Sequence, residues 1–108
     1  MAAYEIRHFC SADGVDVFGE WFDGLHDPQA QQRIAVRTDR LALGLFGDAK
    51  PLRGGVRELR IDYGPGYRVY YAIAGRGVVL LLCGGDKRTQ RADITRAVGH
   101  WLEFQGQR

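Results

Sequence analysis

The chain is poor in the residues on which small secreted domains and many enzymes depend. It has two cysteines, Cys10 and Cys83, which lie far apart, so neither a disulfide framework nor a zinc-ligand spacing is present. We expect both to be free, buried thiols in a reducing compartment. Ser11 is the only serine, and it does not lie in the strand–turn–helix motif of a serine nucleophile. Disulfide-stapled scaffolds and serine-dependent acyl transfer are therefore disfavoured.

Metal ligands and phosphate-binding loops are also missing from the sequence. His8, His26 and His100 are scattered, and no carboxylate or cysteine accompanies them at metal-ligand spacing. The run Gly84–Thr89 lacks the spacing of a phosphate-binding loop, and Gly64–Gly66 does not open a helix as a dinucleotide fingerprint would. We therefore expect no metal site and no cofactor.

The chain has no apolar run that approaches the length of a membrane span, and its first residues lack the apolar core of a signal peptide. We expect a soluble, cytoplasmic protein that does not bind a membrane. A hydrophobic fraction of 45% is enough for a core, and 108 residues suit one small domain, residues 1–108.

Lysine is scarce too, so arginine carries nearly all the positive charge. Lys50 and Lys87 are the two lysines among 15 basic residues, and the net charge is only +2. Arginine is suited to bidentate contacts with phosphate or carboxylate. The bias indicates an anionic partner, or else it reflects a GC-rich genome, and both readings stay open at this point.

What the sequence does contain is a dense hairpin pattern from residue 55 to residue 73. Two strand-like runs flank a turn at 62–66 that is rich in Gly and Pro. Strand side chains alternate between the two faces of a sheet, so the apolar and charged residues separate. The residues expected on the open face, away from the apolar side, are Glu58, Arg60, Arg68 and Tyr70. A carboxylate between two guanidiniums is either an ion-pair ladder or the floor of an anion-binding site.

Two helices are expected before this hairpin, because apolar residues there recur at three- and four-residue steps. The first helix follows a strand at residues 4–9, with Ser11 or Asp13 as its cap. The second helix begins with Asp27 as N-cap and Pro28 at the first helical position, and it runs to about Leu43.

Arginines recur along the second of these helices. Arg33, Arg37 and Arg40 are separated by four and three residues, so they share one stripe of its surface. A stripe of this kind is most often a solvated helix face. A docking surface is the alternative.

The remaining segments complete an α+β domain. We expect a loop at 48–51, a turn at 75–77, a central strand from Val78 to Leu82, a polar loop from Gly84 to Gln90, and a final helix with an apolar stripe from Ile94 to Leu102. A small, mainly antiparallel sheet would then pack on the N-terminal helix pair, with a C-terminal helix beside it.

The three-strand meander brings cations from two strands to one end of the sheet. The strand that begins near Tyr67 runs antiparallel to the strand that ends near Cys83, so Arg68 and Lys87 can converge. Convergent cations stabilise charge on a phosphoryl centre without a metal. In RNA, an activated 2′-OH could attack the adjacent phosphorus while these cations steady the oxyanion.

Other residues of this candidate site follow from their type and position. Arg60 would help to position the phosphate, and Glu58 is the carboxylate on that face that could act as general base. Glu58 could equally neutralise Arg60 or Arg68 across the strands. Further RNA contacts are expected from Lys50, Arg53, Arg57 and Arg88, and from base stacking on Tyr63, Tyr67 or Tyr70. The tyrosines could equally pack within the sheet.

The run from Glu58 to Tyr71 resembles the core of the RelE/ParE toxin superfamily. With Leu81–Lys87 and the spaced Gln90, Asp93, Ile94 and Ala97, it is similar to the HigB-like branch, also described as phage Gp49-like or addiction module killer proteins. The resemblance covers nearly the whole chain, including Trp21, the 33–41 segment and the 47–52 segment. It implies a RelE-like microbial RNase fold and the toxin component of a type II toxin–antitoxin system.

The resemblance also implies an activity and partners. The best-known members cut mRNA in the ribosomal A site without a metal, whereas ParE members poison DNA gyrase. Antitoxins block these toxins by direct binding, and in the HigB branch they usually carry a helix-turn-helix domain. We therefore expect a ribosome-dependent mRNA endoribonuclease, or mRNA interferase, that inhibits translation and arrests growth. Its partners would be the ribosome, mRNA and a HigA-like antitoxin in a hetero-oligomer. A gyrase inhibitor and a degenerate module that only represses its own operon are the alternatives.

The catalytic residues of the family carry over unevenly. Arg68 matches the arginine after the Gly-Tyr pair that supports the transition state in RelE-type toxins. Lys87 and Arg88 fall in the basic segment that holds a second catalytic arginine. Glu58 stands where those toxins have a lysine, and Ile94 stands near the place of their catalytic tyrosine. The resemblance therefore leaves the general acid and base unassigned.

Overall fold

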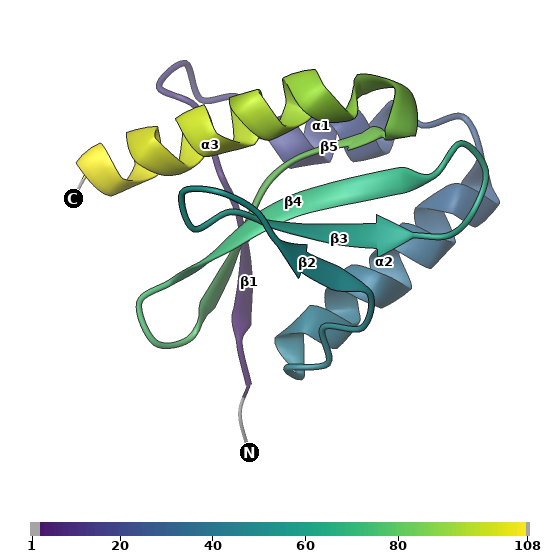
Figure 1. Ribbon diagram of the computed structural model, residues 1–108, viewed down its shortest axis with the longest axis horizontal. Coiled ribbons are helices and arrows are strands. Elements are labelled where there is room, and N and C mark those ends of the chain that lie inside the picture. Colours follow the sequence, from purple (N-terminus) through teal and green to yellow (C-terminus); the bar gives the residue numbers. More distant parts are fainter. Residues whose placement is uncertain (1–2, 108) are drawn as a thin grey trace.

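A five-stranded mixed sheet forms the centre of the molecule (Figure 1). In the computed structural model, which describes residues 3–107, the strands lie in the order β1-β5-β4-β3-β2. They are β1 (Glu5–His8), β2 (Ala49–Pro51), β3 (Arg57–Ile61), β4 (Tyr67–Ala74) and β5 (Val78–Asp86). β1 runs parallel to β5, and the other neighbours are antiparallel. The expected α+β class with a mainly antiparallel sheet is confirmed.

Helices cover both faces of this sheet, as Figure 1 shows. They are α1 (Val17–Asp23), α2 (Pro28–Ala42) and α3 (Gln90–Gly106), the last preceded by a 3₁₀ turn, η1 (Lys87–Thr89). On one face Phe18 of α1 and Ile34 of α2 pack against Val69 and Leu81 of the sheet. On the other face Ala97 and Trp101 of α3 pack with a second set of sheet residues. The strands are thus buried on both faces, which explains the continuous apolar run in β5. None of the described helices is long and apolar enough to cross a membrane.

The N-cap of α1 differs from the expected residue, whereas the N-cap of α2 agrees with the expectation. Asp16, and not Ser11 or Asp13, is the N-cap of α1, because its side chain accepts a hydrogen bond from the Gly19 N–H at 2.9 Å. Ser11 instead accepts from the Val15 N–H at 3.2 Å and so closes the loop before the helix. The cap of α2 is Asp27, as expected, followed by Pro28 in the first turn.

The expected loop at 48–51 is wrong, because Ala49–Pro51 forms an edge strand. In β2 Lys50 pairs with Glu58 and Pro51 pairs with Arg57 of β3. A three-residue strand carries too few side chains to show an alternating pattern, which explains why the sequence did not indicate it. Proline is tolerated there because an edge strand leaves some N–H positions unpaired.

β5 extends to Asp86, beyond the predicted end at Leu82, and it contains an irregularity. Tyr70 pairs with Cys83 whereas Tyr71 pairs with Leu81, so Leu82 is an extra residue in β5. Such a bulge changes which residues face each side of the sheet. It therefore sets the faces of the strand end that precedes Lys87.

Two glycines after this bulge serve close packing and not the expected polar loop. A Cβ atom on Gly84 would collide with the Trp21 ring, and one on Gly85 would collide with the Asp93 carboxylate. Both positions are buried. The Gly84-Gly85 pair thus lets α1 and α3 approach the end of β5 from opposite sides.

The two thiols have different surroundings. Cys83 is buried, as expected, and burial raises the pKa of its thiol to about 12. Cys10 is exposed, so the expectation of two buried thiols is wrong for this residue. Cys10 lies outside the strand β1, where its side chain faces solvent and not the core.

Candidate phosphate-binding site

The strand register brings the charged residues of the hairpin together. Arg60 of β3 lies directly opposite Arg68 of β4, and Glu58 lies opposite Tyr70. Residues 58 and 60 share a face of β3, as residues 68 and 70 do on β4. The four side chains therefore lie on the α3 side of the sheet, as the alternation predicted.

Glu58 is the centre of this cluster. Its side chain is fully buried, and its two oxygens contact different partners. Oε1 accepts a hydrogen bond from Arg60 Nε at 3.1 Å, and Oε2 accepts one from Gln90 Nε2 at 2.7 Å. Arg68 Nε lies 3.8 Å from Oε2. A buried carboxylate is stable only with partners of this kind. The ion pairs of the ladder alternative are therefore present, but the face expected to be open is covered at Glu58 by the start of α3.

Arg68 stands between the buried network and the surface. Its side chain is 13% exposed, and one of its terminal nitrogens donates to the Gly66 carbonyl at 3.3 Å. Within the described residues its Nε has no hydrogen-bond partner that meets strict geometry. The ion pair with Glu58 and the turn carbonyl thus fix the guanidinium while part of it remains accessible.

A cavity of about 370 Å³ lies over the turn between β3 and β4. Arg60, Arg68 and Lys87 contribute three cations to its lining. A Cβ added to Gly66 would lie 3.5 Å from Lys87 Cβ and 3.6 Å from a terminal nitrogen of Arg68, so these residues adjoin. The predicted convergence of Arg68 and Lys87 at one end of the sheet is therefore present. Three cations around one cavity form a site suited to a phosphate group.

The turn η1 determines where Lys87 and Arg88 point. Asp86 caps this turn by accepting a hydrogen bond from the Arg88 N–H at 2.8 Å, and it also pairs with the Arg88 guanidinium at 3.1 Å. The hydrogen bond from the Arg88 side chain lowers the pKa of the Asp86 carboxyl. Arg88 is thus held by Asp86, whereas Lys87 lines the cavity.

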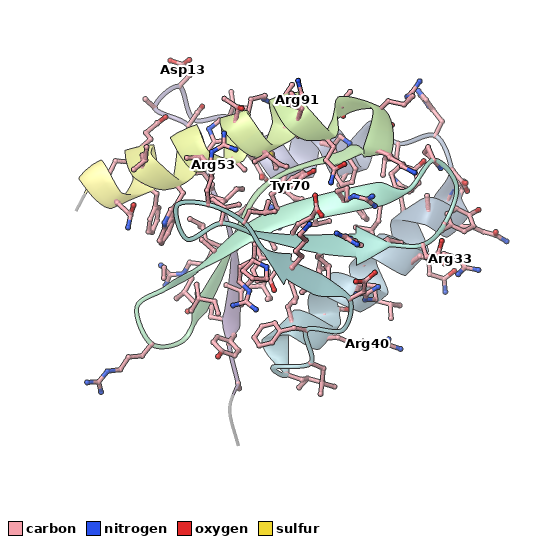
Figure 2. All side chains as sticks on the ribbon, in the orientation of Figure 1. Asp13, Arg33, Arg40, Arg53, Tyr70 and Arg91 are labelled. Atoms are coloured by element: carbon pink, nitrogen blue, oxygen red, sulfur yellow. The ribbon has the colours of Figure 1, made fainter. Side chains whose placement is uncertain are left out.

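The basic residues predicted around the hairpin do not all reach this cavity. Lys50 is exposed and lies opposite Glu58. Arg53 donates to Thr95 Oγ1 at 3.3 Å and lies beside α3 in Figure 2. Arg57 stacks over the Phe46 ring at 5.5 Å, within the α2-side core. The structure therefore places Lys50 on the face of the site and directs Arg53 and Arg57 elsewhere.

The tyrosines proposed as stacking platforms pack against protein. Tyr70 is fully buried, and Tyr67 packs edge-on against Trp21 with ring centroids 6.2 Å apart. The Tyr63 ring is covered by Arg33, whose Cζ lies 4.5 Å from the ring centroid. Burial, and then the nearby Glu58 and Asp93, raise the pKa of the Tyr70 hydroxyl. The packing alternative therefore describes Tyr70 best, because it presents no exposed ring.

Sequence reasoning missed three residues of the site. Gln90 completes the hydrogen bonding of Glu58, and Asp48 and Asp62 line the cavity beside the cations. Gln90 is the first residue of α3, a position that the expected polar loop did not place near β3. Asp48 precedes the edge strand β2, where the Arg60 N–H donates to the Asp48 carbonyl at 2.9 Å. Recognising that strand would have brought Asp48 to Arg60.

Comparison with known proteins assigns the chain to a family. Residues 20–97 match the family described as phage-derived protein Gp49-like. The chain belongs to the Gp49-like family. This family is of the RelE toxin–antitoxin type, so that part of the resemblance is confirmed. The matched residues include Glu58, Arg60, Arg68, Lys87 and Gln90.

A bacterial relative extends this assignment. An uncharacterized protein of Haemophilus influenzae is 48% identical over 80 residues, which make up 74% of this chain and 81% of that protein. No solved structure matches the chain. Membership of a toxin–antitoxin family is consistent with a toxin role and indicates an antitoxin partner.

Proposed function

We propose that this Gp49-like protein is the toxin of a type II toxin–antitoxin system and that it cuts mRNA on the ribosome. In this proposal it has the RelE-like microbial RNase fold, it belongs to the HigB-like branch, and residues 1–108 form one cytoplasmic domain. The observation that carries the proposal is the buried Glu58, which fixes two arginines at a cavity that Lys87 also lines.

The cations would act on the scissile phosphate. The 2′-OH gives up its proton and its oxygen attacks phosphorus. The bond to the 5′-oxygen breaks, and this oxygen takes a proton from water, so a 2′,3′-cyclic phosphate and a 5′-hydroxyl result. Arg68 and Lys87 would bind the non-bridging oxygens, where negative charge grows in the transition state, and Arg60 would position the group. Such stabilisation comes from fixed charges and needs no metal.

Glu58 suits a positioning role in this mechanism better than that of a base. It is fully buried and already contacts Arg60, Arg68 and Gln90, so a 2′-OH could not reach it without breaking these contacts. The carboxylates that line the cavity, Asp48 and Asp62, are better placed to accept the 2′-OH proton. Contacts to flanking RNA would come from Lys50 and Arg88, which are both exposed.

A gyrase inhibitor without nuclease activity is the second candidate. The observation that favours it is Ile94, which packs against the α3-side core near the place of the family's catalytic tyrosine. Glu58 likewise occupies the place of a lysine. An inhibitor that only binds its target would need neither proton-transfer group.

Mapping of RNA 5′ ends after induced expression separates the two candidates. The nuclease predicts new 5′ ends inside translated messages, in phase with codons, and none with Arg68→Ala expressed at the same level. Intact messages together with altered DNA supercoiling would contradict the nuclease and favour gyrase.

A further inference from the structure

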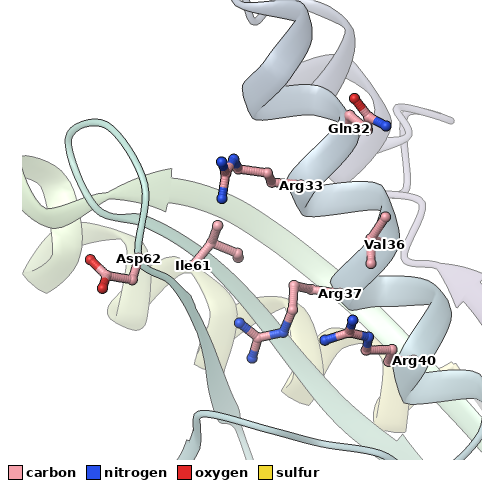
Figure 3. A pocket seen from close by; sticks show the side chains of 7 residues that line it. All are labelled: Gln32, Arg33, Val36, Arg37, Arg40, Ile61 and Asp62. Carbon is pink, nitrogen blue, oxygen red and sulfur yellow. The ribbon is translucent and has the colours of Figure 1, made fainter.

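A second cavity lies on the opposite side of the hairpin, between α2 and the end of β3 (Figure 3). Its volume is about 480 Å³, and Arg33, Arg37 and Arg40 line it together with Val36 and Ile61. The arginines lie on one stripe of α2, and Figure 3 shows all three reaching from the helix toward β3. We call this cavity the α2 groove.

Two of these arginines are held in place by uncharged groups. An Arg37 terminal nitrogen donates to the Arg60 carbonyl at 2.8 Å, so Arg37 forms the floor and is not part of a solvated stripe as expected. Arg33 lies over the Tyr63 ring at 4.5 Å, and the Tyr63 hydroxyl donates to Asp27 at 3.0 Å. Both guanidiniums are therefore held in position by groups that do not neutralise their positive charge.

The α2 groove keeps an excess of positive charge. Within residues 3–107 none of its three arginines takes part in an ion pair. Asp62 lines the edge of the groove, but Figure 3 shows its carboxylate turned away from the guanidiniums. Arg33 and Arg40 are exposed, and they remain available to carboxylates or phosphates.

An apolar stripe runs beside the basic one. Val36 and Leu43 are seven residues apart on α2 and its C-cap, so they lie on the same side of the helix. Their exposed fractions are 41% and 63%, and Leu45 just beyond is 57% exposed. Exposed apolar area next to charged groups is typical of surfaces that bind another protein.

We infer that the α2 groove docks an acidic amphipathic segment of an inhibitory partner protein, which rests on the proposed toxin function. Glutamates or aspartates of the segment pair with Arg33 and Arg40 above the Arg37 floor. Its apolar side packs on Val36 and Leu43, in the manner of a helix laid against a groove. An RNA strand would use the arginines but would leave Val36 and Leu43 exposed to water, so a protein segment fits both stripes better.

The position of the groove explains how such a segment would inhibit. Ile61 and Asp62 line both the α2 groove and the phosphate-binding cavity. A segment bound to the groove therefore ends at the edge of that cavity. The Arg37 hydrogen bond to the Arg60 carbonyl joins the two surfaces directly. The partner would block access of RNA without touching Arg68.

Two probes of opposite chemistry test the inference on the full chain. The first is a helical peptide with leucines at i, i+4 and i+7 and flanking glutamates, and the second is an oligouridine. We expect Arg40→Ala and Val36→Ser each to weaken peptide binding by about tenfold, measured by fluorescence anisotropy. Arg76→Ala, an equal change of charge at the exposed β4–β5 turn, should leave peptide binding unchanged.

The oligouridine reports the alternative occupant. We expect Val36→Ser to leave its binding unchanged and Arg40→Ala to weaken it no more than Arg76→Ala does. Equal peptide binding by all variants would overturn the inference. A loss of oligouridine binding confined to Arg40→Ala would assign the groove to RNA and overturn it as well.

These measurements do not depend on catalysis. If groove-dependent peptide binding occurs while induced cells keep intact messages, the nuclease proposal fails and the docking surface stands. If messages are cut in phase with codons and all variants bind the peptide equally, only the docking inference fails.

Discussion

Two arginine-rich surfaces lie on opposite sides of strand β3 and meet at Ile61 and Asp62. On the α3 side, Arg60 and Arg68 are anchored by the buried Glu58. On the α2 side, Arg33 and Arg37 are oriented by an aromatic ring and a backbone carbonyl. The two surfaces differ in their counter-charge. On the α3 side the fold itself supplies a carboxylate, whereas on the α2 side a binding partner would have to supply it.

This difference separates two uses of the same residue type. A transition state needs cations at fixed positions, and a buried carboxylate with three partners holds them there. A docking surface needs accessible charge beside apolar area, so that binding supplies the missing counter-charge. Residue type alone could not distinguish these uses, but burial and partners do.

The largest effect on stability is expected at Glu58. Glu58→Gln removes the buried negative charge and leaves Arg60 and Arg68 facing an amide, so we expect a loss of about 3–5 kcal/mol in the free energy of unfolding. Denaturant unfolding measures this loss. Glu20→Gln, at an exposed position of α1, is the matched control and should change stability little. If Glu58→Gln lowers the free energy of unfolding no more than Glu20→Gln does, the network does not anchor the arginines.

A smaller effect is expected at the floor of the α2 groove. Arg37→Ala removes the hydrogen bond to the Arg60 carbonyl, so we expect a loss of about 1.5–3 kcal/mol. Arg40 lies on the same stripe but is exposed, so the free energy of unfolding of Arg40→Ala should lie within about 0.5 kcal/mol of the parent value. Thermal or denaturant unfolding of the two variants compares them. Equal changes in the free energy of unfolding would contradict the claim that Arg37 is a structural part of the groove floor whereas Arg40 is accessible to solvent.

The smallest effect is expected at the cap that orients Lys87. Asp86→Ala removes the acceptor for the Arg88 N–H, so we expect a loss of about 1 kcal/mol. The Arg88 hydrogen bond lowers the pKa of the Asp86 carboxyl in the folded chain. The carboxylate therefore stabilises the fold above its ordinary pKa, and this contribution disappears as the pH falls through the lowered value.

Unfolding of the parent chain and of Asp86→Asn across acidic pH checks the Asp86 pKa shift. Their difference should be constant near neutrality and should shrink once Asp86 is protonated. A difference that grows on acidification would contradict the assigned direction of the shift.

Much of the fold follows from local pattern. Alternation in the hairpin sorted Glu58, Arg60 and Arg68 from the apolar side, and the Asp27-Pro28 pair marked the start of α2. These features depend on neighbours in sequence, which the sequence displays directly. The meander then sufficed to bring Arg68 and Lys87 to the same end of the sheet.

What the sequence could not supply depends on tertiary contacts. The burial of Glu58 requires α3 to begin over β3, and Gln90 becomes its partner only through that packing. The bulge at Leu82 appears only when β4 and β5 are paired. The role of Arg37 depends on a carbonyl 23 residues away in the chain. Helical periodicity placed Arg37 on a stripe but could not show what the stripe faces.

The most direct test of which basic surface carries the chemistry is the rate at which purified variants cut a translated mRNA on the ribosome. We predict that Arg68→Ala lowers this rate by about 100- to 1,000-fold, measured at a temperature at which circular dichroism shows the variant to be folded. Arg40→Ala, matched in charge on the other side of β3, should cut at the parent rate. Equal losses for the two variants, or a full rate with Arg68→Ala, would contradict the assignment of the chemistry to the Glu58-anchored site.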